Sequence, residues 1–251
     1  MGSGSVRINM PNRAALLAEV RARLAAHKGF AVATLNLDHL VKIAVSPVFA
    51  QAYARQDLVV ADGRPVVWFS RLAGQPVQLA PGSELILPLC ETAQAMGAKV
   101  ALVGSSAEVL AKASLDLRAA VPGLDICATI APSQNFDPDG IEAARILASL
   151  DGAGAQLCFL ALGAPKQERL AARARDLVPD IGFVSIGAGL DFIAGSQKRA
   201  PRWMRRLALE WLWRALENPA RMAPRYGRCF LILPRLTAAA LRIRLRGMSR
   251  P

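Results

Sequence analysis

Histidine, cysteine and long apolar runs are scarce in this sequence, and each shortage argues against a class of protein. The 251 residues include only two histidines, which argues against a histidine-based metal site. The four cysteines lie far apart without a CxxC pair, so we expect buried free thiols in a reducing cytoplasm. No uninterrupted apolar run reaches the ~20 residues that a membrane-spanning helix needs, and the first ten residues lack the apolar core of a secretory signal.

Two nucleotide-binding motifs are also missing. A dinucleotide-binding domain carries GxGxxG after an early strand, with an acidic residue about 20 positions later. This chain has a glycine cluster only late, in IGAGLDFIAG at 186–195, which disfavours a dehydrogenase. It also lacks GxxxxGK[ST], which excludes the P-loop NTPases.

Acidic residues are rare in the last fifth of the chain. Residues 198–251 hold 14 of the 31 basic residues but only two of the 19 acidic ones, so they carry the whole net charge of +12. Their arginines recur at helical spacing on one side, and apolar residues such as Trp211 and Leu212 lie on the other. We therefore divide the chain into a core, 1–197, and a basic amphipathic helical appendage, 198–251.

The core alternates apolar strands with helical segments. Hydrophobic residues make up 53% of the whole chain, which is enough to form a sizeable hydrophobic core. Strands are expected at 31–36, 57–63, 99–106, 125–131, 155–163 and 181–189. Helices are expected at 13–26, from LDHLVKIA at 37–44, and at 83–97, 107–121, 141–150 and 165–178. This alternation predicts an α/β fold: a doubly wound, mostly parallel, Rossmann-like sheet with helices on both faces.

Polar and small residues follow the carboxyl ends of these strands, where open parallel sheets bind ligands. The turns VGSS and LGAPKQE allow a ligand to approach the backbone, and the following helix starts offer free N–H groups to phosphate. Lys166 would add a charge and Gln167 an amide. The alternative is an ordinary strand-to-helix turn in which Pro165 and Glu168 favour the helix start. The candidate residues are Gly104, Ser105, Gly163, Pro165, Lys166, Gln167, Glu168, Gly187 and Asp191.

Asp62 directly follows an apolar strand and could act as a general base. The alternative is a common Asp-Gly turn pair. Thr34 and Asn36 offer a hydroxyl and an amide on one strand face, or alternatively cap a helix. Asp137 and Asp139 form a DxD that could hold a metal with a nucleotide sugar, although a loop and helix cap fits this segment better.

Taken together, the segments TLNLDHLVK, VVADGRPVVW, VALVGSS, LGAPKQE, IGAGLDFIAGSQKRAP and LEWLWRALENPARM resemble, in the same order, those of the WecG/TagA/CpsF glycosyltransferases. The resemblance runs from about residue 31 to about residue 226. It implies an inverting glycosyltransferase of cell-surface polysaccharide synthesis, which moves N-acetylmannosamine, its uronic acid or glucose from a UDP-sugar to a polyprenyl-diphosphate-linked sugar.

The resemblance also implies roles for individual residues. Asp62 matches the proposed catalytic base, and Thr34 and Asn36 match residues of the same pocket. Residues 163 and 165–168 match a nucleotide-side motif. Arginines of the appendage would close over the diphosphates: Arg199, Arg214 and Arg221. One segment departs from the family pattern, because Leu79 and Glu84 stand where an arginine and an aspartate are usual, and this puts the identity of the sugar in doubt.

These assignments set the expected partners. We expect no cofactor and no metal, since arginines are available to stabilise the UDP leaving group. The basic appendage would dock on an anionic membrane surface, so we expect a cytoplasmic enzyme at the inner face of the cell membrane. Its arginines alternatively lie solvated on a packed helix. A nucleotide- or nucleic-acid-binding protein is the competing class, although we expect no nucleic acid because the sequence contains no known binding module. The sequence leaves open whether the chain forms a homo-oligomer.

Overall fold

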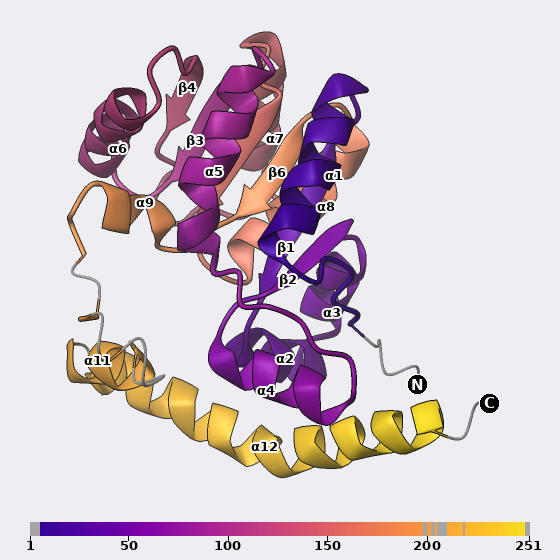
Figure 1. Ribbon diagram of the computed structural model, residues 1–251. Helices are drawn as coiled ribbons and strands as arrows, with labels where there is room; N and C mark the ends of the chain where they lie inside the picture. Colours follow the sequence, from indigo (N-terminus) through magenta and orange to yellow (C-terminus); the bar gives the residue numbers. More distant parts are fainter. Residues whose placement is uncertain (1–5, 198–199, 202–203, 205–209, 218, 249–251) are drawn as a thin grey trace.

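Six parallel strands form one sheet at the centre of the protein (Figure 1). The computed structural model describes residues 6–197, 200–201, 204, 210–217 and 219–248. The strand order is β2-β1-β6-β5-β3-β4, and every pairing is parallel. The strands are β1 Phe30–Leu35, β2 Leu58–Ala61, β3 Val100–Gly104, β4 Ile126–Ile130, β5 Leu157–Ala161 and β6 Gly182–Ser185. The α/β prediction is confirmed.

Helices cover both faces of this sheet, which explains why the strands are apolar on both sides. Val32 of β1 packs in a cluster with residues of α1, α5, α6 and α9. Ala31 and Phe183 lie in a second cluster with residues of α7 and α8. The helices of the core are α1 Arg13–Ala25, α2 Leu37–Val45, α3 Pro47–Ala54, α4 Arg64–Leu72, α5 Gly82–Ala95, α6 Ala107–Ala120, α7 Ile141–Gly152, α8 Lys166–Leu177 and α9 Gly189–Ile193.

The connections that follow β1 and β6 leave the sheet toward opposite faces. Phe49 of α3, after β1, packs with Ala33 in a third cluster, whereas Leu190 of α9, after β6, packs with Val32. Neighbouring side chains of a strand point to opposite faces, so α3 and α9 cover different sides of the sheet. Such a divergence is where open α/β sheets bind ligands, beyond the carboxyl ends of the strands.

Two helices near this edge, α3 and α4, were not among the predicted elements. Each begins with a local signal of one or two residues. Ser46 caps α3 by accepting from the Phe49 N–H, and Pro47 lies in its first turn. Pro65 lies in the first turn of α4. The observed strands also end earlier than predicted. For example, β2 stops at Ala61 rather than at residue 63, because Asp62 and Gly63 already belong to the turn.

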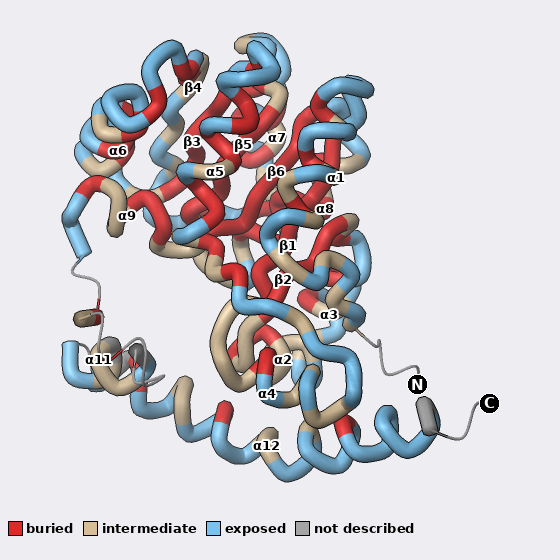
Figure 2. The backbone as a smooth tube through the Cα atoms, viewed as in Figure 1, coloured by how far each residue is buried: buried red, intermediate tan, exposed pale blue. Residues whose placement is uncertain are grey.

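The C-terminal segment forms two described helices, α11 Glu210–Glu217 and α12 Pro219–Met248. Figure 1 shows α12 running across α2 and α4, and it contacts both of these helices as well as α11. Among the residues of α12 whose burial is described, Met222, Cys229 and Ala240 are buried, while Figure 2 shows most of the helix exposed. Within the described residues, no helix is both long and apolar enough to cross a membrane.

The turn after β3 depends on a glycine. Gly104 has φ +113°, and a Cβ there would lie 2.5 Å from the backbone carbonyl of Ala161 in β5. We predict that Gly104→Ala lowers the free energy of unfolding by about 3 kcal/mol, through overpacking and backbone strain. Gly97→Ala is the matched control: it has φ +64° but no atom within 4 Å of the added Cβ, and it should cost about 1 kcal/mol. Equal losses in urea denaturation would contradict the steric argument.

Candidate active site

The ends of β1 and β6 meet the start of α5 at the carboxyl edge of the sheet. Thr34 of β1 is buried, and its Oγ1 donates to the carbonyl of Ser185 in β6 at 3.2 Å. Gly82, the first residue of α5, approaches both strands so closely that an added Cβ would lie 3.3 Å from Cγ2 of Thr34 and 3.1 Å from Cα of Ile186. The structure therefore places Thr34 at a crowded junction where three elements converge.

Asn36 and Asp62 lie at the ends of the adjacent strands β1 and β2. The backbone N–H of Asp62 donates to the carbonyl of Leu35 at 2.7 Å, which ties the two strand ends together. Asn36 caps α2, since its Oδ1 accepts from the His39 N–H at 3.0 Å. Asp62 itself is half-buried. The structure thus brings Thr34, Asn36 and Asp62 to one edge, as the sequence suggested.

The segment that departs from the family pattern passes beside Asp62. Leu79 pairs with Ala61 in a parallel bridge, and the N–H of Ala80 donates to the Ala61 carbonyl at 2.8 Å. Leu79 is partly exposed, and Glu84 lies in the first turn of α5. Leu79 therefore pairs with the residue that directly precedes the candidate base.

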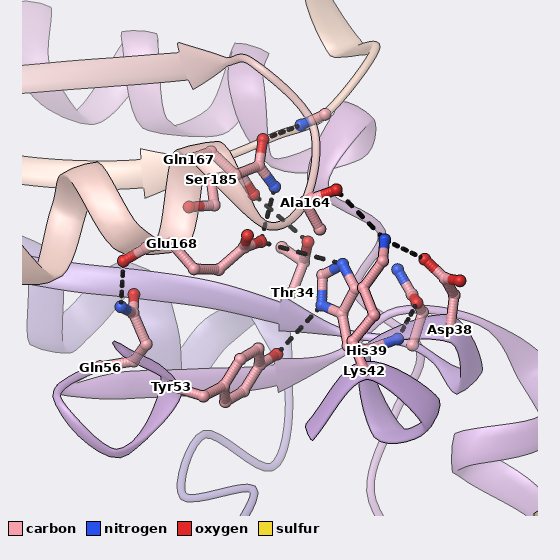
Figure 3. Close-up of polar contacts among 12 residues, drawn as sticks. Thr34, Asp38, His39, Lys42, Tyr53, Gln56, Ala164, Gln167, Glu168 and Ser185 are labelled. Atoms are coloured by element: carbon pink, nitrogen blue, oxygen red, sulfur yellow. Dashed lines mark hydrogen bonds and ion pairs between the residues drawn. The ribbon is translucent and has the colours of Figure 1, made fainter. Parts of the chain in front are cut away.

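Gln167 joins two turns of this edge. Its Oε1 accepts from the backbone N–H of Gly187 at 3.1 Å, and its Nε2 donates to Oε1 of Glu168 at 2.8 Å (Figure 3). The side chain is 2% exposed. The sequence suggested that Gln167 faces a nucleotide, whereas the structure commits both ends of its amide to protein partners. Gln167 therefore holds the β5–α8 turn against the β6–α9 turn.

Glu168 is fully buried behind this junction. Its Oε1 lies 3.8 Å from Nε2 of His39, whose Nδ1 is 3.3 Å from the hydroxyl of Tyr53. Gln56 donates to the Glu168 carbonyl at 3.0 Å. Within the part of the chain that the structure describes, Oε2 of Glu168 has no hydrogen-bond partner. Glu168 is thus placed to support the turn from behind rather than to face solvent.

Burial disfavours the charged form of both groups in this pair. Desolvation raises the pKa of Glu168 to about 7, against the hydrogen bond from Gln167 that lowers it. Desolvation and the nearby Lys42 charge lower the pKa of His39 to about 3. His39 is therefore neutral at pH 7, and Glu168 titrates close to neutrality. No sequence motif pointed to His39 as a site residue. The signal that could have found it is Asn36, which caps the helix that carries His39.

A second group of candidates lies in the segments that follow β3, β5 and β6 at this edge. Ser105 Oγ donates to Asp191 Oδ1 at 3.0 Å, which ties the β3–α6 turn to α9. Ser105 has φ +60°, and Gly104, Gly163 and Gly187 also have positive φ. These residues shape the tight turns at the strand ends.

The remaining candidate residues are more exposed, or lie outside the part of the chain that the structure describes. Pro165 precedes α8 and is exposed, and Lys166 is half-buried at the start of that helix. Arg199 lies outside the described residues. Arg214 and Arg221 fall in α11 and α12, but their side chains are not described.

The DxD segment is engaged by an arginine. Arg169 of α8 forms ion pairs with Asp137 (Nη2 to Oδ1, 3.9 Å) and with Asp139. Arg173 donates to the carbonyls of Pro138 and Gly140 at 3.1 and 2.8 Å. Among the described residues, no group of three or more His, Cys, Asp or Glu side chains could hold a metal ion. These contacts fit a loop, whereas the helix-cap part of the alternative is wrong, because the N-cap of α7 is Gly140 and has no side-chain hydrogen bond.

The raised pKa of Glu168 predicts a pH-dependent stability. The ordinary pKa of a glutamate is 4.5, whereas that of Glu168 in the folded protein is about 7, so the folded state binds the carboxyl proton more tightly than the unfolded state. The stability that comes from this proton is lost as the pH rises from 4.5 through about 7. Glu168→Gln cannot titrate. Relative to this variant, the wild type should lose more than about 1 kcal/mol of unfolding free energy between about pH 5 and about pH 8. Urea denaturation at both pH values measures this. Exposed Glu108→Gln is the control, and a pH-independent difference for Glu168→Gln would refute the assignment.

Comparison with known proteins shows the family of the chain. The family model for "Glycosyl transferase WecG/TagA/CpsF family" matches residues 3–250. The chain is 30% identical over 218 residues to the N-acetylglucosaminyldiphosphoundecaprenol N-acetyl-beta-D-mannosaminyltransferase of Bacillus spizizenii, and the alignment covers 86% of this chain and 80% of that protein. A match of this extent leaves only a few residues of the chain outside the family pattern. The chain therefore belongs to the WecG/TagA/CpsF family of glycosyltransferases, which are hexosyltransferases.

Proposed function

We propose that this enzyme transfers a hexose or N-acetylhexosamine, with inversion, from a UDP-sugar to a polyprenyl-diphosphate-linked sugar. The Bacillus spizizenii relative is, by its name, an N-acetylmannosaminyltransferase that acts on diphosphoundecaprenol-linked N-acetylglucosamine. The observation that carries the proposal is the position of Asp62. It follows β2 at the carboxyl edge, beside the end of β1 that bears Thr34 and Asn36.

In this mechanism Asp62 removes the proton from the acceptor hydroxyl while that oxygen attacks the sugar carbon. The bond between that carbon and the UDP oxygen breaks on the opposite side, and UDP leaves with the bonding electrons. The positive end of the α8 dipole and the charge of Lys166, its first residue, can stabilise the diphosphate. Arg199, Arg214 and Arg221 are proposed to contribute charge in the same way.

We further propose that α12 docks on an anionic membrane. Its exposed apolar side chains include Phe230, Leu231, Leu241, Ile243 and Leu245. Arginines 235, 242, 244 and 246 lie among them. An amphipathic helix of this kind can bury its apolar side chains at the headgroup boundary while its arginines pair with anionic lipids. This would bring the strand ends to an acceptor that is itself held in the membrane.

The test of the reaction is a product search by mass spectrometry. The donors are the UDP derivatives of N-acetylmannosamine, N-acetylmannosaminuronate, glucose and N-acetylglucosamine. The acceptors are short-chain polyprenyl-diphosphate-linked glucose and N-acetylglucosamine. A new disaccharide lipid with one pair supports the proposal.

Each pair is run with EDTA and with Mg²⁺. We expect equal turnover, because Arg169 already pairs with both aspartates of the DxD.

Asp62→Asn should fold normally and lose about 100-fold or more of kcat, because the amide cannot accept the acceptor proton. The KM for the donor should change little. Exposed Asp151→Asn is the matched control and should keep wild-type turnover. Steady-state kinetics with the active donor–acceptor pair measure both variants, and near-normal turnover of Asp62→Asn would remove it as the base.

Leu231→Asp should weaken binding to anionic vesicles about tenfold, because the apolar side chain is lost and a negative charge meets the anionic surface. Leu231 is 82% exposed, so the change should leave the melting temperature unaltered. Leu177→Asp, on the exposed side of α8, is the control. Vesicle co-sedimentation measures both. Equal binding of the two variants would show that α12 is not the membrane anchor.

A further inference from the structure

One carboxylate oxygen on α2 forms ion pairs with two cationic side chains, which come from different helices. Oδ2 of Asp38 lies 2.6 Å from Nζ of Lys42, one turn further along α2. The same Oδ2 lies 3.2 Å from Nη2 of Arg225 in α12. The positions of the two cations are therefore linked through a single shared atom.

Lys42 continues this chain of contacts to the candidate site. Its Nζ donates to the carbonyl of Ala164 at 3.1 Å, and Figure 3 shows the amine between that carbonyl and Asp38. Ala164 lies in the β5–α8 turn between Gly163 and Pro165, in the segment proposed to bind the diphosphate. The contacts thus run from the C-terminal helix to the turn.

The burial of Asp38 distinguishes these contacts from an ordinary surface ion pair, which contributes little to stability. Asp38 is 9% exposed. Burial alone would raise the pKa of Asp38, but the hydrogen bond from Lys42 and the charges of Arg225 and Lys42 hold it below its ordinary value. The carboxylate is therefore ionised at neutral pH. If either cation moves, the buried charge that it neutralises is left with a single partner, which is unfavourable.

We propose that Asp38 and Lys42 are positioning residues that couple the seating of α12 on α2 to the shape of the β5–α8 turn. When Arg225 is in place, Asp38 is held toward Lys42, and Lys42 holds the Ala164 carbonyl. When α12 shifts, this constraint on the turn relaxes. The proposal rests on the proposed function in one respect, namely that the turn binds the UDP moiety. Docking of the C-terminal helix would then change donor affinity through the turn, in addition to any direct contact of Arg221 with the diphosphate.

The experiment is a double-mutant cycle on the full-length protein, with the dissociation constant of UDP as the readout. Lys42→Met removes the link to the turn, and Arg225→Gln removes the link to α12. We expect Arg225→Gln to weaken UDP binding about threefold in the wild-type background and to have no further effect in the Lys42→Met background. Arg225→Lys should restore most of the affinity. Arg228→Gln, an exposed arginine of the same helix, is the control and should leave UDP binding unchanged.

A second readout does not depend on the proposed function. Amide hydrogen exchange in residues 163–169 should become at least about threefold faster in Arg225→Gln, and should stay at the wild-type rate in Arg228→Gln. Faster exchange without UDP binding by any variant would keep the coupling and overturn the nucleotide assignment of the turn. Unchanged exchange, or additive effects on UDP affinity, would overturn the coupling itself.

Discussion

The parallel alignment of all six strands is the constraint on which the rest of this structure depends. Because every strand runs the same way, every strand-to-helix turn lies at one edge of the sheet. Residues as far apart as Thr34 and Ser185 become hydrogen-bonded neighbours there. The ladder itself is backbone chemistry and needs no particular side chain. It therefore leaves the turns free to carry the residues of a glycosyltransferase.

The carboxyl edge is built in two layers with different electrostatics. Asp62 and Lys166 are partly accessible, so water or a substrate can stabilise their charges. Glu168 and His39 lie behind them, where burial favours their neutral forms. The buried layer fixes the turns through amide contacts such as that of Gln167 with Gly187. A rigid arrangement of this kind suits catalysis, because the donors aimed at a leaving group need not reorganise during the reaction.

The C-terminal helix connects this edge to the outside of the protein. It packs on α2 and α4, which themselves follow the two strands that bear Thr34 and Asp62. The buried residues of α12, such as Met222 and Cys229, meet the protein, while Phe230 and Leu231 beside them remain exposed. One helix thus has both a seat on the core and a free apolar side. The proposals for membrane docking and for coupling through Arg225 concern these two sides of the same element.

The sequence by itself determined the α/β class, the positions of the six strands to within a few residues, and the clustering of Thr34, Asn36 and Asp62. These follow from local signals: apolar runs, turn residues and the rule that parallel strand ends share an edge. Only the tertiary structure decided that Gln167 and Glu168 face inward. Two of their partners, Gln56 and His39, lie 112 and 129 residues from Glu168 in the chain, and helical spacing does not specify such distant contacts. For the same reason Asp38 and Lys42 showed only an (i, i+4) pair in the sequence, whereas folding brought Ala164 and Arg225 to them.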